Sequence, residues 1–167
     1  MGSPIFVPRR LAEEIEKRGL NLEDAIIEAL SKQLNFDLKT IAESRLELAE
    51  RYLAEGRSLV DKDPVQASEK LYKAAEECVK ALAMHFNLED ILRSVEIWGK
   101  WTVADLEKAV KAISERIGGW FGEAWDRAWA LHVWGFHEAK FDSSAVRIRM
   151  PYVEKIVEEA KKLFRQG

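Results

Sequence analysis

The stretch that decides the fold runs from Ser68 to Leu82 and reads S-E-K-L-Y-K-A-A-E-E-C-V-K-A-L. Its small and apolar positions recur at helical spacing and form one stripe: Ala67, Leu71, Ala74, Ala75, Cys78 and Leu82. Asp63 followed by Pro64 marks the start of this helix, because proline fits the first helical turn, where no N–H is needed. The pattern predicts a long helix buried between partner helices.

The segment before this helix predicts the first helix that packs against it. A second long helix is expected from Asp37, which can cap it, to about Asp61. Its apolar residues line one face: Leu38, Ile41, Ala42, Leu48, Ala49, Tyr52, Leu53, Leu59 and Val60. Because only Lys62 and its neighbours separate the two helices, they should pack as an antiparallel hairpin.

Shorter patterns lie on both sides of the hairpin. Before it come an extended piece from Pro4 to Pro8 and two short helices separated by Gly19. Four segments follow it: an irregular stretch at 87–101, a helix from a Thr102–Asp105 capping pair to Gly118, a helix at about 120–140, and a last helix with Pro151 in its first turn. No strand of convincing length is present.

The sequence therefore predicts an all-α protein, a four-helix up-and-down bundle with short N-terminal helices and a C-terminal helix. We expect residues 1–36 to form an extended arm and two short helices packed on the bundle, and residues 37–167 to form the bundle domain. A tetratricopeptide array is disfavoured, because nothing after Phe86 repeats the unit at 37–86.

Composition narrows the function classes. The formal net charge of -3 provides no overall attraction to nucleic acid, so RNA or DNA binding must rest on local residues. A single cysteine, Cys78, excludes a disulfide within the chain and is expected to be a small buried hydrophobe. We find no cleavable leader and no apolar run near the ~20 residues of a membrane span, and expect a cytoplasmic protein. Abundant Glu, Lys and Arg with scarce Asn and Gln predict a thermophilic source.

Two stretches resemble the archaeal PaREP family. They read R-S-L-V-D-K-D-P-V-Q-A-S-E-K-L-Y-K-A-A-E-E at 57–77 and A-L-H-V-W-G-F-H-E at 130–138, and the resemblance extends from about Phe36 to the C-terminus. It implies a helical bundle of the HEPN type, which is found in prokaryotic nucleotidyltransferase partners and in many RNases. A nucleotidyltransferase-type partner protein is therefore an expectation. The family's own activity is not established.

The HEPN resemblance also implies a candidate RNA-cleaving site. Active HEPN RNases carry an arginine followed four to six residues later by a histidine, and this chain has Arg127 and His132. The imidazole of His132 could take a proton from a ribose 2′-hydroxyl while the guanidinium of Arg127 holds the phosphate, without a metal. His137 is an auxiliary candidate. Ala128 stands where active members carry a polar residue, which departs from the catalytic pattern.

Helix geometry adds a condition to this site. Residues five apart on a straight α-helix are about 140° apart around its axis, so Arg127 and His132 would not share a face. Either the helix is distorted there or the pair acts across a dimer. A metal site is not predicted at His132 and His137, because paired helical ligands usually lie four apart and these two lie five apart.

Structural explanations compete for the same residues. Four positions share one helical face, which is typical of a core or a subunit interface: Trp125, Trp129, His132 and Phe136. Glu123 lies four residues before Arg127, so a surface ion pair could account for the arginine. The small residues of the neighbouring face suit close helix packing: Ala124, Ala128, Leu131 and Gly135.

The N-terminus suggests a different function class. An extended segment followed by two short helices resembles a ribbon-helix-helix DNA-binding module, and Arg9 and Arg10 follow the segment directly. However, a strand that reads the major groove must present polar side chains, whereas the residues from Pro4 to Val7 are apolar. We expect an arm that packs on the bundle or on a partner chain.

Three functions remain open. The chain is predicted to be a homodimeric interaction or nucleotide- and RNA-binding module, since it has more Trp and Leu stripes than a four-helix core of this size needs. The first alternative is a metal-independent endoribonuclease, and the second is a ribbon-helix-helix-like DNA-binding regulator. No cofactor and no metal are predicted for any of them.

Overall fold

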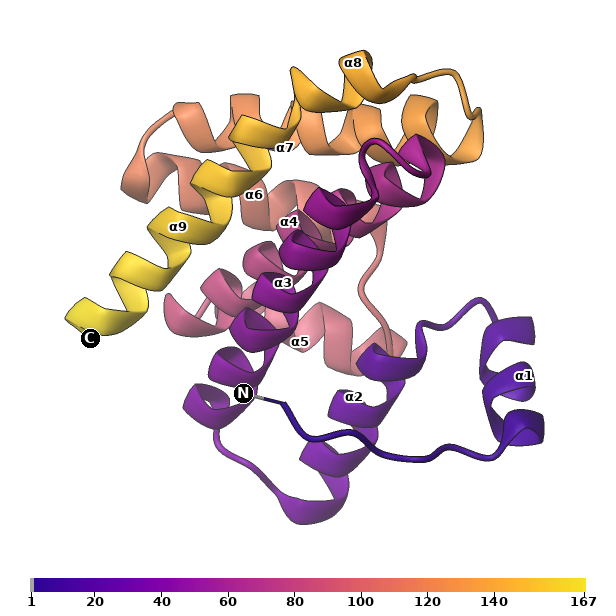
Figure 1. The fold of residues 1–167 in the computed structure, drawn as a ribbon. Coiled ribbons are helices and arrows are strands. Elements are labelled where there is room, and N and C mark those ends of the chain that lie inside the picture. The colour runs from indigo at the N-terminus through magenta and orange to yellow at the C-terminus, as the bar shows by residue number, and fades with distance from the viewer. Residues whose placement is uncertain (1) are drawn as a thin grey trace.

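The computed structural model describes residues 2–167, and every regular element in that range is helical (Figure 1). The elements are α1 (Arg9–Lys17), α2 (Leu22–Leu34), α3 (Leu38–Leu59), α4 (Pro64–His85), α5 (Glu89–Trp98), α6 (Val103–Ile117), α7 (Trp120–Ala130), the π-helix η1 (Leu131–His137), α8 (Ser143–Arg147) and α9 (Met150–Gln166). The all-α prediction is thereby confirmed. Within the described residues, no helix is both long and apolar enough to cross a lipid bilayer.

Helices α3 and α4 form the predicted hairpin, and their capping residues are the predicted ones. The Asp37 carboxylate accepts a hydrogen bond from the backbone N–H of Thr40, and Asp63 accepts one from Gln66. The two helices come unusually close at Gly56, where an added Cβ would lie 2.8 Å from the Leu71 side chain. A glycine at this position therefore allows the hairpin to close.

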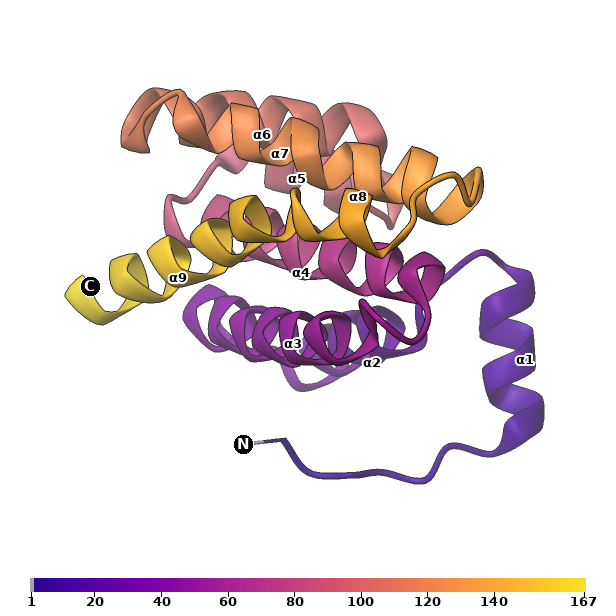
Figure 2. The ribbon, with the colours of Figure 1, turned by 45° about the horizontal axis from the view of Figure 1, so that its top comes forward.

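Helix α4 lies at the centre of the molecule and packs against α3, α6, α7, η1 and α9. Figure 2 shows the layers: α6 and α7 on one side of α4, and α3 with α2 on the other. The small and apolar stripe predicted for α4 is fully buried in this position. Its members have no exposed surface: Ala67, Leu71, Ala74, Ala75, Cys78 and Leu82. Cys78 is thus a buried hydrophobe, as predicted, and burial raises the pKa of its thiol.

The segment at 87–101 differs from the sequence expectation. It contains a regular ten-residue helix, α5, which ends at Gly99 in the left-handed region with φ of 69°. Ile91 is the buried residue of this helix, and Leu88, directly before it, is buried as well. The short helix α8 was likewise not predicted. By contrast, the capping box of α6 is present, with Thr102 and Asp105 bonded reciprocally.

The helix expected at about 120–140 is not a continuous α-helix. Its α-helical part, α7, ends at Ala130, and the chain continues as the π-helix η1. The bond from the Glu138 N–H to the Val133 carbonyl, five residues back, is 2.9 Å long and belongs to this pattern. The sequence required either a distorted helix or a pair acting across a dimer for Arg127 and His132 to work together. The helix is distorted.

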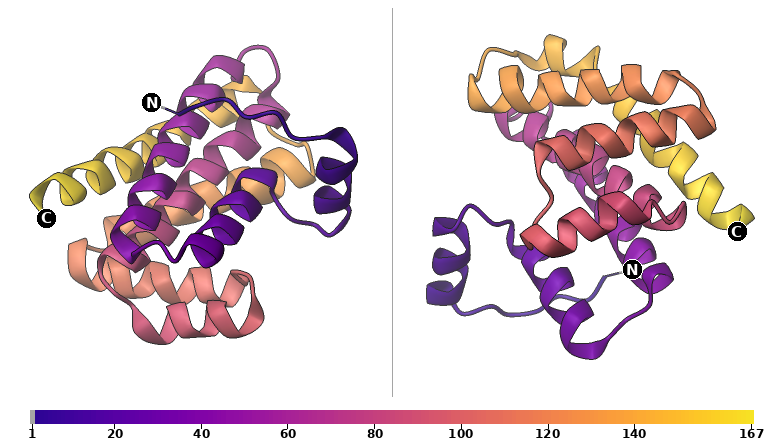
Figure 3. Two further views of the ribbon diagram at one scale, coloured as in Figure 1. Left: turned by 90° about the horizontal axis from the view of Figure 1, so that it is seen from below. Right: turned by 180° about the vertical axis from the view of Figure 1, so that it is seen from behind.

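The N-terminal residues reach the bundle through α2. Helix α1 contains no buried residue and contacts α2, and Figures 1 and 3 show it standing apart from the other helices. Gly19, with φ of 70°, makes the turn between the two helices, and Asn21 caps α2 by accepting from the N–H of Asp24. The division into units 1–36 and 37–167 remains a prediction.

Candidate functional site

A buried ion network joins α2 to the hairpin. Arg45 on α3 has no exposed surface, and its guanidinium donates to Asp24 and Glu28 at 2.5 Å each and to Glu77 at 2.8 Å. Lys80 on α4 is also buried and donates to Asp24 at 2.8 Å. Burial alone would raise the pKa of Asp24, but Lys80 and Arg45 lower it well below its ordinary range. Burial raises the pKa of Glu77.

A pocket of about 500 Å³ opens beside this network, between α2, α4, the loop before α6, and α7 with η1. Its aromatic lining consists of Tyr72, Trp101, Trp129 and His132. Its charged lining consists of Asp24, Glu28, Glu69, Glu76, Lys32, Lys80 and Lys100. Pockets that combine aromatic walls with a few polar groups are the usual places for small ligands.

The aromatic side chains form one connected cluster. The Tyr72 ring on α4 stacks on His132 with ring centroids 4.0 Å apart and planes at 24°. Trp129 lies 5.9 Å from Tyr72 and 5.3 Å from His132, centroid to centroid. Trp125 is buried behind them and donates its indole N–H to Glu107 at 2.7 Å. The aromatic face predicted from the sequence therefore belongs partly to the core and partly to the pocket wall.

Most charges of the pocket already have partners. Lys80 and Arg45 bind Asp24, Arg45 also binds Glu28, and Lys80 lies 3.6 Å from Glu76. The carboxylate of Glu69 contacts His132. Lys32 and Lys100 are exposed, and neither has an ion-pair partner within 4.0 Å among residues 2–167. The charged groups of the pocket that remain free to bind a ligand are thus cationic.

One polar group of the pocket is unpartnered. The indole Nε1 of Trp101 is buried and has no hydrogen-bond partner in the described part of the chain. A buried N–H donor without an acceptor costs free energy, about 1–3 kcal/mol.

The structure brings His132 and His137 together. Their Nε2 atoms lie 3.2 Å apart, and the Nδ1 of His132 lies 2.9 Å from a carboxylate oxygen of Glu69 on α4. The carboxylate of Glu69 accepts a hydrogen bond from the Nδ1–H of His132. The Nε2 of neutral His132 therefore carries a lone pair, and His137 can donate a hydrogen bond to it. The π-helix produces this contact, since a turn bonded from residue i to i+5 places residues five apart nearly above one another.

Arg127 lies in a different place. It is exposed, and its guanidinium sits over the Tyr152 ring of α9 at 5.3 Å, whereas His132 faces Glu69 and Tyr72 of α4. Within one chain, Arg127 and His132 therefore do not converge on a shared phosphate. The ion pair expected between Glu123 and Arg127 is absent from the described residues, and the arginine packs on an aromatic ring instead.

Several residues of the pocket were not singled out by sequence reasoning. Glu69, Tyr72 and Glu76 lie at i, i+3 and i+7 on α4, so they form a polar edge beside its buried stripe. That spacing is a visible signal for one face, although it does not reveal which helix covers it. His85, the third histidine, is the last residue of α4, and its ring stacks on Phe164 with centroids 4.7 Å apart.

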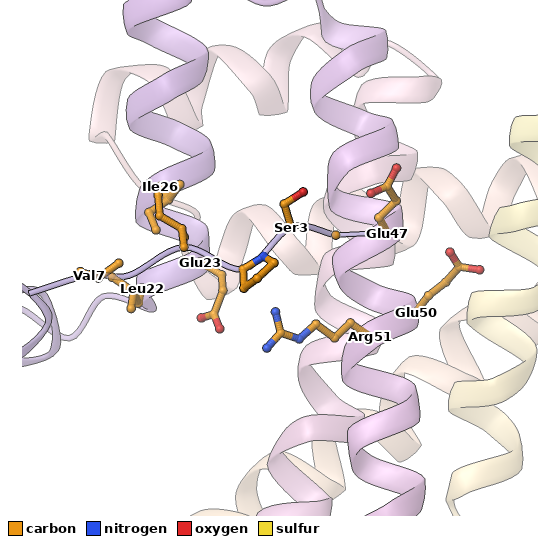
Figure 4. A pocket seen from close by; sticks show the side chains of 11 residues that line it. Ser3, Val7, Leu22, Glu23, Ile26, Glu47, Glu50 and Arg51 are labelled. Atoms are coloured by element: carbon orange, nitrogen blue, oxygen red, sulfur yellow. The ribbon is translucent and has the colours of Figure 1, made fainter.

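A second pocket, of about 720 Å³, lies between the N-terminal arm and helices α2 and α3 (Figure 4). Carboxylates from both helices line it, namely Glu23, Glu47 and Glu50, with Arg51 as the basic member. Its lining holds no aromatic ring, no histidine and no cysteine. In the arm itself, Ile5 and Phe6 are 73% and 87% exposed. No contact of the arm within the described residues favours the ribbon-helix-helix alternative.

Comparisons with solved structures identify close relatives of this fold. A crystal structure of a protein from Sulfolobus solfataricus is similar with a TM-score of 0.65 and 38% sequence identity, over 70% of this chain and 95% of that one. A solution structure of an open-reading-frame protein with the same target designation has a TM-score of 0.61 and 38% identity, over 69% of this chain and 89% of the other. A comparison with curated proteins finds no match.

The family comparison agrees with the resemblance of the two sequence stretches. The model of the Archaeal PaREP1/PaREP8 family matches residues 44–157, which include most of the hairpin, the pocket residues of α4 and the π-helix. This match covers more than half of the chain. The chain belongs to the archaeal PaREP1/PaREP8 family.

Proposed function

We propose that this protein is a nucleotide-binding module without catalysis of its own, and that the base of the ligand enters the pocket between α2, α4 and α7. The observation that carries the proposal is the combination of an aromatic wall with unpaired cations. Tyr72, Trp129 and His132 form the wall, and Lys32 and Lys100 are the cations. Bases stack on aromatic side chains, and lysines bind phosphates as point charges.

The polar groups of the pocket suit a base as well. Trp101 lines the pocket, and its unpartnered Nε1 could donate to a ring nitrogen or carbonyl once the indole turns toward the ligand. The carboxylates of Glu69 and Glu76 can accept from exocyclic amino groups. A volume of about 500 Å³ lies within the range of ligand pockets, ~300–1,000 Å³.

The bundle arrangement is the second part of the proposal. A HEPN-like core would consist of α3, α4, α6 and α7 with η1, and α9 would be the additional C-terminal helix. Several large apolar side chains are exposed, among them Ile97 at 74% and Trp98 at 69% on α5, and Trp134 at 54% on η1. Exposed apolar surface of this kind supports a homodimer or a nucleotidyltransferase-type partner protein. Sedimentation of the purified protein would test the dimer, and a purely monomeric species at every concentration would contradict it.

Nucleotide binding is testable by calorimetric titration with adenosine, AMP and ATP, and with a single-stranded RNA oligonucleotide. Replacing Trp129 by Leu removes a stacking surface worth about 1–3 kcal/mol per base, so affinity should fall roughly 5- to 150-fold. The double substitution Lys32→Gln and Lys100→Gln should weaken ATP more than adenosine, because only ATP carries phosphates. Lys111→Gln, on α6 and outside the pocket lining, is the matched control. Absence of binding by any of the four ligands would refute the proposal.

The endoribonuclease alternative keeps one supporting observation. Glu69 orients the imidazole of His132, as a carboxylate does for a histidine that acts as general base. Arg127 would have to come from a second copy of the chain, because its own guanidinium lies over Tyr152. An RNA-cleavage assay distinguishes the two functions: cleavage by the wild type that is lost in both His132→Ala and Arg127→Ala would favour the enzyme.

A further inference from the structure

The π-helix η1 brings two histidines into contact that an α-helix would keep apart. His132 and His137 are five residues apart, and the i-to-i+5 turn places both imidazoles on the same side of the helix. Their rings stand nearly perpendicular, at 82°, with centroids 4.5 Å apart, and the Nε2 atoms of the two rings are in contact. The objection that metal ligands on a helix must lie four apart applies to α-helices and not to this turn.

The distance between the two nitrogen atoms fits a shared metal ion. Zinc binds histidine nitrogen at about 2.0–2.1 Å in tetrahedral geometry, which separates two nitrogen ligands by about 3.3 Å. The Nε2 atoms of His132 and His137 are 3.2 Å apart. A metal ion could therefore replace the proton between them once the two rings turn so that both Nε2 lone pairs point at the ion.

The surroundings of His132 match those of a metal-binding histidine. Histidine ligands commonly donate the N–H of the other ring nitrogen to a carboxylate, which sets the tautomer and the ring orientation. Glu69 occupies this position at 2.9 Å from Nδ1, and stacking on Tyr72 further restrains the ring. His137 is exposed, so water or a ligand can reach the remaining coordination positions.

We propose that His132 and His137 are the two protein ligands of an open site for a late first-row transition metal ion, Zn²⁺ above all, with Glu69 as the carboxylate that orients His132. Imidazole nitrogen favours Zn²⁺, Cu²⁺ and Ni²⁺ over the hard cations Mg²⁺ and Ca²⁺. Residues 2–167 contain no group of three or more His, Cys, Asp or Glu side chains placed to hold a metal ion. Water or a bound ligand therefore completes the coordination. The site shares His132 and Glu69 with the nucleotide pocket, but no nucleotide is needed for the two histidines to bind the ion.

The test is a zinc titration of tag-free, chelator-treated protein by calorimetry. The wild type should bind one Zn²⁺ per chain, and His132→Ala and His137→Ala should each weaken binding more than tenfold. Glu69→Gln should weaken it about 10- to 100-fold, the usual effect of losing a carboxylate that orients a ligand. His85→Ala is the matched control, because this histidine stacks on Phe164 and is the one that lies outside the pair. Binding should be unchanged in this variant.

A second readout separates coordination from folding. Long-range nitrogen–proton NMR spectra of the imidazoles should show Zn²⁺-dependent shifts at the Nε2 atoms of His132 and His137, and none at His85. Since His137 is exposed, His137→Ala should retain the wild-type circular dichroism spectrum. Equal zinc affinity in all four variants, or no zinc binding by the wild type, would overturn the proposal.

Discussion

At the residue scale, Gly135 controls how closely η1 approaches α4. It is buried, and an added Cβ would lie 2.6 Å from the Cβ of Ser68 and closer still to its hydroxyl oxygen. Ser68 cannot easily rotate away, because its hydroxyl donates to the Pro64 carbonyl at 2.7 Å. The same close approach of η1 to α4 brings His132 to Glu69. The absence of a side chain at Gly135 therefore allows the candidate site to form.

Gly135→Ala should destabilise the fold by about 1–3 kcal/mol, the usual cost of overpacking a tight contact. The free energy of unfolding from urea titration measures the loss. Gly119→Ala is the matched control, since an added Cβ at Gly119 meets nothing within 4 Å and should change stability little. A loss at Gly135 no larger than at Gly119 would show that η1 can move away from α4 without cost.

At the element scale, local signals predicted most helices because those signals act within one turn. Asp37, Asp63 and Thr102 cap the predicted helices through backbone N–H groups three residues ahead. The π-helix was not predictable in this way. Its hydrogen bonds differ from those of an α-helix by one residue, and the apolar pattern of the segment is compatible with both.

The attachment of α2 to the hairpin depends on Arg45. Arg45→Met should cost about 3–5 kcal/mol, because it removes one of the two cations, Arg45 and Lys80, that pair with the buried carboxylate of Glu77 and the partly buried carboxylate of Asp24. Chemical denaturation monitored by circular dichroism measures the effect. Arg51→Met on the same helix is the control, since Arg51 is largely exposed, pairs with Glu55, and should cost less than about 1 kcal/mol. Equal losses in the two variants would contradict a structural role for the network.

At the scale of the whole molecule, the pocket exists because four separate parts of the chain meet around α4: α2, the loop before α6, α7 and η1. The ion network lies at this junction and links the stability of the molecule to pH. The pKa of Asp24 is lowered in the folded state by Lys80 and Arg45, against the effect of burial. Its stabilising contribution is therefore complete above the unfolded pKa of about 3.9 and is lost as the pH falls through the folded value.

Asp24→Asn should therefore be clearly less stable than the wild type at pH 7, and the difference should shrink when both are measured near pH 3. Urea denaturation at the two pH values gives the comparison. Asp126→Asn, at an exposed position on α7, provides the control and should show a small difference at both. A stability difference for Asp24→Asn that is the same at pH 7 and pH 3 would exclude this linkage.

The sequence by itself determined the all-α class, the hairpin of α3 and α4, the buried stripe of α4 and the family, because capping and periodicity are encoded within a few residues. The site was decided by the tertiary structure. His132 and Glu69 are 63 positions apart, and they meet because η1 packs on α4. Tertiary packing likewise decides where Arg127 points and whether Arg45 is buried, since both depend on which helix faces the side chain. The contact between His132 and His137 depends on one π turn. Neither of these is contained in local spacing.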